Sequence, residues 1–211
     1  KQGLTTPWTV AVDSDNNEQT GTGILALSTV GPVTFAGAYF NQTNLKNSSD
    51  AMIDGVDVDR DANGTPILTN GKQTFNAGTS AKTLFDGSED IATIGAITTL
   101  GPVTLDAWYL DAQDIFDSYT VGAKAATELS GVKLGADARW ASLEEDDADD
   151  KNTIAKIVLT ADAGLVDAKL AYAMTGNEGG LTALDNDAVT TLLGWNLALN
   201  GKTDADYVQA V

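Results

Sequence analysis

The chain has 211 residues, and its 12 basic and 30 acidic side chains give a formal charge of −18. This charge argues against nucleic acid as a partner, because phosphates need Lys and Arg to neutralise them. The chain has no cysteine and no histidine, which excludes disulfides, thiolate metal sites and the usual general base of enzymes. No apolar run approaches the about 20 residues of a membrane helix, and residues 1–8 lack the apolar core of a signal peptide.

Taken in order, the chain predicts about ten β-strands, most of them joined as hairpins. A short stretch ends at Pro7 and Trp8, and an acidic loop follows it. The predicted strands then cover 23–29, 33–42, 91–100, 103–110, 117–128, 132–143, 152–161 and 165–175, with a last one within 196–211. Gly and Pro mark tight turns between them, at Gly31-Pro32, Gly101-Pro102, Ser130-Gly131 and Gly164.

The stretch 132–143 has the clearest alternation of apolar and charged residues in the chain. Successive side chains of a strand point to opposite faces, so every second residue shares a face. One face carries Val132, Leu134, Ala136, Ala138 and Trp140, and the other carries Lys133, Asp137 and Arg139. A soluble sheet would bury the apolar face in a core, whereas a transmembrane barrel would turn it toward lipid.

The connections between the predicted strands alternate in length. The tight turns contrast with longer, acidic connections at 10–20, 44–90, 111–117, 144–151 and 177–195. Short turns at one end and long loops at the other are typical of outer-membrane barrels. Several predicted strands also approach the about 9–11 residues of a tilted membrane strand. The predicted fold class is therefore all-β, an antiparallel transmembrane β-barrel; the alternative is a soluble β-sandwich with uneven loops, which composition alone favours.

Continuing the alternation from strand to strand gathers charged side chains on one face. They are Asp106, Lys124, Lys133, Asp137, Arg139, Lys156, Asp167 and Lys169. We predict that these residues line a pore, with the five basic ones forming a ladder along one wall. The alternative is a solvated sheet surface with ordinary Lys–Asp pairs across strands.

Several short motifs resemble one family. They are the opening Lys1–Thr9 with the acidic loop and Gly21-Thr22-Gly23 behind it, then Leu129–Leu134, Trp140–Leu143 and Leu199–Thr203. Together they resemble the major outer membrane porins of the Campylobacter-related, epsilon-class bacteria. The resemblance implies a homotrimeric barrel of 16–18 strands in the bacterial outer membrane, of which this chain is an interior portion, roughly half. It also implies contact with outer-membrane lipid and lipopolysaccharide, and passive diffusion of ions and small hydrophilic solutes.

The resemblance further implies where the pore narrows. In such porins the loop after the first stretch folds inward, which here is the loop 9–20, with Asp13, Asp15 and Glu18 as constriction acids. The loops 44–90 and 177–195 are then expected to be external. Because the large negative charge raises the local cation concentration, we expect a weakly cation-selective channel.

One motif in the loop 44–90 suggests a metal ion. Residues 59–64 fit the opening of a calcium loop, D-x-[DN]-x-[DN]-G, with Asp59, Asp61 and Asn63 as candidate ligands. The twelfth position holds Asn70 instead of the usual Glu, and a chance match in an acid-rich loop explains the motif as well. Calcium is therefore the one candidate ion, and no cofactor is expected to be required.

The sequence gives little support to catalysis. It has no cysteine, no histidine and no G-x-S-x-G motif to supply an activated nucleophile. We therefore predict that the protein is not an enzyme. The alternative function is that of a secreted calcium-binding adhesion or surface-layer β-domain, which would share the acidity and the lack of cysteine.

Overall fold

A computed structural model describes most of the chain. It covers residues 1–13, 18–49, 84–146, 151–191 and 202–211, the single residues 193 and 199, and six two-residue strands between 52 and 80. Predictions that fall elsewhere lie outside the described residues. Within the described part, no helix is long and apolar enough to cross a membrane.

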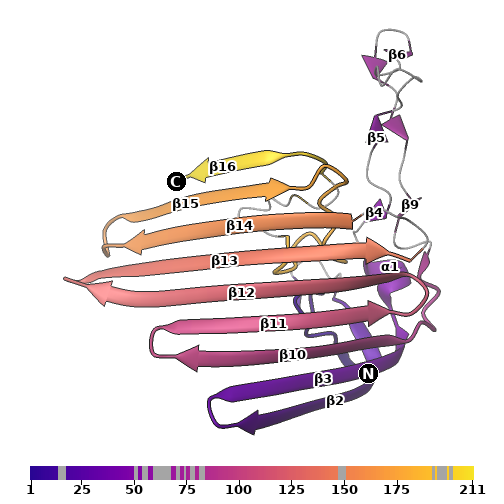
Figure 1. The fold of residues 1–211 in the computed structure, drawn as a ribbon, viewed down its shortest axis with the longest axis horizontal. Coiled ribbons are helices and arrows are strands. Elements are labelled where there is room, and N and C mark those ends of the chain that lie inside the picture. Colours follow the sequence, from indigo (N-terminus) through magenta and orange to yellow (C-terminus); the bar gives the residue numbers. More distant parts are fainter. Residues whose placement is uncertain are drawn as a thin grey trace.

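The main element is a ten-stranded antiparallel sheet in which neighbours in sequence are neighbours in space (Figure 1). Its strands are β1 (Gln2–Gly3), β2 (Thr20–Val30), β3 (Val33–Thr43), β10 (Ile91–Leu100), β11 (Val103–Ala112), β12 (Phe116–Leu129), β13 (Val132–Glu145), β14 (Lys151–Asp162), β15 (Asp167–Thr175) and β16 (Asp206–Ala210). The predicted all-β antiparallel fold is confirmed, and each predicted hairpin strand is present.

Smaller elements follow β3. The helix α1 (Leu45–Ser48) has four residues. The strands β4 (Met52–Ile53), β5 (Asp57–Val58), β6 (Leu68–Thr69), β7 (Lys72–Gln73), β8 (Phe75–Asn76) and β9 (Thr79–Ser80) pair as β4 with β9, β5 with β8 and β6 with β7. They belong to the long connection between β3 and β10.

The tight turns lie at one end of the sheet and the longer connections at the other (Figure 1). Gly31 and Gly101 both have φ +59° and precede a proline, which is the geometry of a type II′ hairpin turn. Ser130 and Gly131 both have positive φ, as a type I′ turn requires. The connection predicted at 111–117 is shorter than expected, because β11 runs to Ala112 and β12 begins at Phe116.

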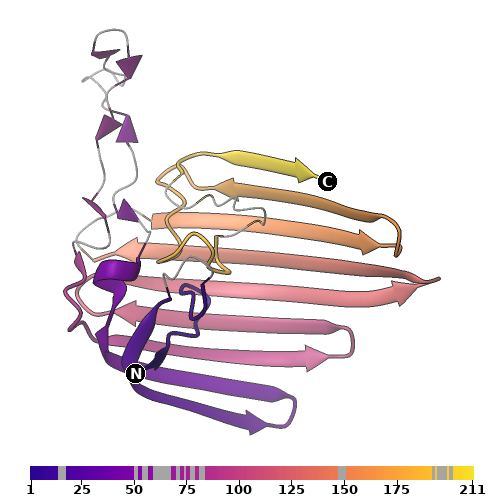
Figure 2. The same cartoon turned by 180° about the vertical axis from the view of Figure 1, so that it is seen from behind.

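The two faces of the sheet differ in what covers them. Figure 2 shows the N-terminal segment, α1 and the connection between β15 and β16 in front of one face, which we call the inner face; the opposite one is the outer face. The predicted alternation follows this division. On β12, Phe116, Ser118 and Thr120 are fully buried toward the inner face, while Tyr119 and Val121 are 45% and 50% exposed on the outer face.

The buried core lies between the inner face and its covering segments, near the long-loop end. It contains Leu4, Trp8, Phe40, Leu45, Phe85, Ile91, Leu110, Ala112, Phe116, Leu143, Leu181 and Leu184. A second cluster joins Ala141, Ile154 and Ala173 of the sheet to Leu193 and Leu199 of the β15–β16 connection. Apolar side chains from three separate segments therefore pack on one face of the sheet, which fixes the covering segments there.

Candidate functional site

The covering segments form one hydrogen-bonded unit. The Leu184 amide donates to the Trp8 carbonyl at 2.9 Å, and the Thr190 amide donates to the Pro7 carbonyl at 3.1 Å. The fully buried Gln19 ties three segments together. Its Nε2 donates to the carbonyls of Ser48 and Leu184 at 3.2 and 3.0 Å, and its Oε1 accepts from the Val10 amide at 3.0 Å. Because this buried amide is well satisfied, it holds the segments in one arrangement.

A buried hydrogen bond fixes this unit to the sheet. The Trp8 indole Nε1 donates to the Ser118 hydroxyl on β12 at 2.6 Å. That hydroxyl in turn donates to the Ser142 carbonyl on β13 at 2.7 Å. Further along the sheet, Lys169 Nζ donates to the Leu193 carbonyl. The covering segments are therefore tied by polar as well as apolar contacts to the inner face.

A buried ion pair lies on the inner face at mid-sheet. Arg139 Nη2 of β13 contacts Asp106 Oδ2 of β11 at 2.8 Å, with side chains only 3% and 11% exposed. Arg139 Nη1 also donates to the Thr120 hydroxyl at 3.0 Å. The pair passes over β12 at Gly122, which stands directly opposite both charged residues. A Cβ there would lie 2.3 Å from Arg139 Nη2, so only glycine leaves room for the pair.

The neighbouring charges on this face are also paired, at more exposed positions. Lys124 and Asp137 are 3.2 Å apart with side chains 52% and 36% exposed. Lys133 and Asp162 are 3.4 Å apart. Lys156 stands directly opposite Arg139 in the register of β14 and β13. The eight charged residues predicted to share a face do so. Three of the basic ones, Lys124, Lys133 and Arg139, have an acidic partner on a neighbouring strand, so the wall has mixed charge.

A cavity of about 740 Å³ lies between the covering segments and the inner face. One side is apolar and comes from β2, β3 and β10, with Leu25, Leu27, Ala36, Ala38 and Ile97. The other side carries Asp106, Lys124 and Arg139. Thr5, Thr6, Pro7 and Val189 of the covering segments border it. A solute in this cavity would therefore meet polar and apolar surface together.

The sequence-predicted loop residues are described only in part. Asp13 and Glu18 lie in the segment that covers the inner face, and the Glu18 carbonyl accepts from Asn44 Nδ2 at 2.8 Å. Asp15 and the calcium candidates Asp59, Asp61 and Asn63 lie outside the described residues. Among the residues that are described, no group of three or more acidic side chains is arranged to hold a metal ion. Calcium binding at 59–63 stays a prediction.

Sequence reasoning missed the residues that assemble the site across distant segments. Gly122, Thr120 and Ser118 carry no local motif, and their roles depend on which residues stand opposite them. The sequence marks Trp8 only as the end of a stretch, although its indole anchors the covering segments to the sheet. The one usable signal was parity, because Ser118, Thr120 and Gly122 fall on the same strand face as Lys124.

Known structures share this fold. No family model and no curated protein matches the chain. OpdL of Pseudomonas aeruginosa is similar over 97% of this chain and 52% of its own, with a TM-score of 0.70 and 18% identity. OccAB4 of Acinetobacter baumannii matches 99% of this chain and 50% of its own, with a TM-score of 0.68 and 13% identity. The outer membrane protein OpdK of Pseudomonas aeruginosa matches 96% of this chain and 49% of its own, with a TM-score of 0.63 and 15% identity.

The chain spans about half the length of these structures. At such identities the likeness establishes the fold: the sheet corresponds to about half of an antiparallel porin barrel. The inner face then corresponds to the lumen side of that barrel and the outer face to its outside. The predicted fold class is confirmed, while the resemblance to the Campylobacter-related family stays a prediction.

Proposed function

We propose that the protein is an outer-membrane porin, a passive diffusion channel for ions and small hydrophilic solutes. The observation that carries this proposal is the contrast between the two faces of the sheet. The outer face exposes large apolar side chains such as Ile94 at 63%, Val121 at 50% and Leu170 at 50%. The inner face carries charged pairs and inward-folded segments. A sheet with a wet, charged inside and an apolar outside suits a barrel in lipid.

The comparisons support the same class of function. The similar structures are outer-membrane porins, which are channels and not enzymes. A soluble adhesion or surface-layer domain would have to bury the outer face in a second layer, and the described residues leave it open. We therefore propose that the protein lies in the bacterial outer membrane, in contact with its lipid. Contact with lipopolysaccharide, assembly as a homotrimer and a constriction at 9–20 are further proposals, which rest on the sequence resemblance alone.

We further propose that the channel is weakly cation-selective. Acidic and basic side chains on the described inner face largely offset each other, so the excess negative charge comes from the loops. Charge at a pore mouth raises the local concentration of counter-ions. Screening shortens to about 8 Å at physiological ionic strength, so the selectivity should fade as salt rises.

Reversal potentials in a salt gradient test this proposal. Neutralising Asp13, Asp15 and Glu18 together should move the zero-current potential toward anion permeation, because three acids leave the narrow part of the pore. The matched control neutralises Asp86, Glu89 and Asp114, which line a recess at the long-loop end. This triple substitution changes the net charge by the same amount. Equal shifts of the zero-current potential in the two triple variants would show that the selectivity arises at the pore mouth and not at a constriction. No shift at normal conductance would place the constriction elsewhere, with 177–195 the next segment to examine.

A further inference from the structure

The outer face carries an uninterrupted apolar band with aromatic residues along one border. Among the described strands, outward side chains between this border and the tight turns are all uncharged. The border residues are partly exposed, at 46% for Tyr39, 45% for Tyr119, and 40% each for Trp140 and Tyr172. Tyr109 packs against Tyr119 with ring centroids 5.0 Å apart. Tyr and Trp prefer a position where one end of the side chain is apolar and the other is wet.

Carboxylates stand directly beyond this border, on its long-loop side. The Tyr109 hydroxyl donates to Asp117 at 2.6 Å, and the Tyr172 hydroxyl donates to Asp206 at 2.6 Å. Tyr39 makes a side-chain hydrogen bond with Asp90. Three tyrosines on three separate strands thus carry their hydroxyls toward charge and their rings toward the apolar band. The border separates a polar zone from an apolar one.

The border runs obliquely across the strands. Tyr39 stands level with Asp111, because both are opposite Ala92. Tyr109 and Tyr119 face each other one outward position closer to the tight turns. Trp140 lies one position further, opposite Val121. Tyr172 lies one position beyond that, since its partner Ile157 stands opposite Ala138.

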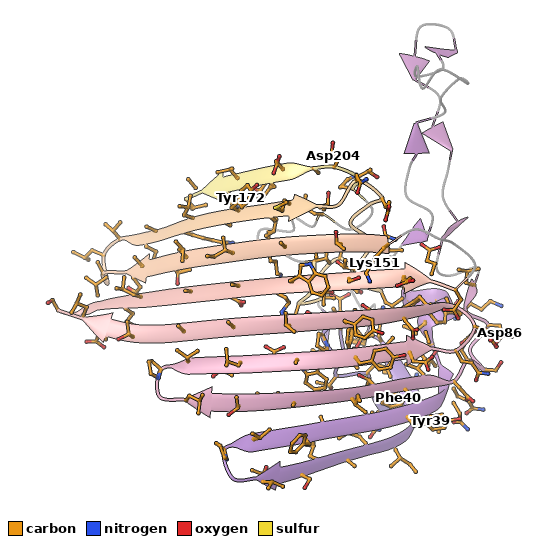
Figure 3. All side chains as sticks on the ribbon, viewed as in Figure 1. Tyr39, Phe40, Asp86, Lys151, Tyr172 and Asp204 are labelled. Carbon is orange, nitrogen blue, oxygen red and sulfur yellow. The ribbon has the colours of Figure 1, made fainter. Side chains whose placement is uncertain are left out.

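The slope of this line has a definite size. It falls by three outward positions, or six residues, between β3 and β15, which are six strands apart in the sheet. With about 3.4 Å per residue and about 4.8 Å between strands, it drops about 20 Å over about 29 Å. The line therefore crosses the strands at about 35° from their perpendicular. In Figure 3, Tyr39 accordingly lies near the long-loop end, whereas Tyr172 lies nearer the middle of its strand.

We propose that this line of Tyr39, Tyr109, Tyr119, Trp140 and Tyr172 lies at the lipid headgroups on the long-loop side of the membrane. The slope equals the strand tilt of about 35–45° found in membrane barrels, so the line is level when the barrel stands upright. The occupant of the band is lipid, because an apolar surface bordered by Tyr, Trp and carboxylates matches the change from hydrocarbon to headgroups. This inference rests on the proposed function.

The line also gives a depth to the inner site. Asp106 adjoins Ala107 on β11, which is two residues from Tyr109 toward the tight turns. Arg139 adjoins Trp140 on β13. The buried Arg139–Asp106 pair therefore lies just inside the membrane from the headgroup level, on the lumen side of the wall. The charged part of the cavity falls within the membrane span.

Spin labels at two outward alanines test the line. Ala107 and Ala155 stand in one register row, joined through Val121 and Trp140, and the chain has no cysteine of its own. Ala107→Cys and Ala155→Cys are labelled separately in the protein refolded into phosphatidylcholine vesicles. Power saturation with oxygen and with a nickel chelate then gives each depth. The two positions are three strand spacings of about 4.8 Å apart. With the strands tilted by about 35°, the label at 107 should lie about 8 Å deeper in the membrane than the label at 155.

Each outcome decides the inference. Equal depths would overturn the inference, because the register row and not the aromatic line would then be level. A deeper label at 155 would also overturn it, because the strands would then tilt in the opposite sense. A label reached by neither relaxing agent would show a protein partner on that strand and would overturn lipid as the occupant. Ala96→Cys, opposite Ala107, repeats the comparison if one variant fails to fold. Conductance of the same variants reports separately on the channel, so loss of depth contrast in a conducting protein counts against the headgroup line alone.

Discussion

Replacing Arg139 by methionine should destabilise the sheet far more than removing an exposed cation from the same face. Arg139→Met leaves Asp106 with its carboxylate buried and without its charged partner, since these side chains are 3% and 11% exposed. Breaking a buried ion pair from one side costs about 3–5 kcal/mol. We expect a loss in that range in the free energy of unfolding.

The matched control is Lys124→Met, on the neighbouring strand and the same face. Lys124 and its partner Asp137 have side chains 52% and 36% exposed. Exposed ion pairs contribute about 0–1 kcal/mol, because water solvates the remaining charge. The double variant of Asp106→Asn with Arg139→Met should lose less than the sum of the two single changes, because no unpaired charge is left behind.

Denaturant unfolding of the refolded protein, followed by tryptophan fluorescence, measures these differences. The four tryptophans of the chain report the transition without added probes. If Arg139→Met and Lys124→Met differ by less than about 1 kcal/mol, burial of the Arg139–Asp106 pair is not what stabilises this part of the wall, and the reasoning fails.

Two further predictions concern the faces and the covering unit. Leu134 and Asp137 lie on opposite faces of β13. Of single cysteines placed at these two positions, only the one at 137 should react with a membrane-impermeant thiol reagent. Preferential labelling at 134 would show that the two faces are assigned the wrong way round. Ser118→Ala removes the acceptor of the buried Trp8 indole, which should cost about 1–3 kcal/mol and increase current noise as the covering unit loosens. The exposed outward Ser28→Ala serves as its control, and equal behaviour of the two variants would exclude an anchoring role for Trp8.

The strands and their faces could be predicted because alternation is a local property of the sequence. In β13, the charges at 133, 137 and 139 and the apolar residues between them give the face of each residue without knowledge of its partners. The same holds for the Gly-Pro turns, where a glycine with positive φ and a proline that donates no hydrogen bond fix a hairpin.

The pairing of charges could not be predicted, because it depends on register and burial. The sequence shows Lys124 and Asp137 on one face, but not that they stand directly opposite each other. It does not show that Gly122 leaves the gap through which Arg139 reaches Asp106. It also gives no sign that Gln19 bonds to Leu184, 165 residues away. For these reasons the sequence alone predicts a basic ladder, whereas in the structure acidic side chains pair with three of its members.

Single-channel recording of the full-length protein in a planar bilayer tests the central claim most directly. A porin whose lumen is the inner face should give discrete, ohmic conductance steps on insertion, in proportion to salt concentration. Purified, folded protein that inserts into the bilayer and gives no such steps would contradict the account.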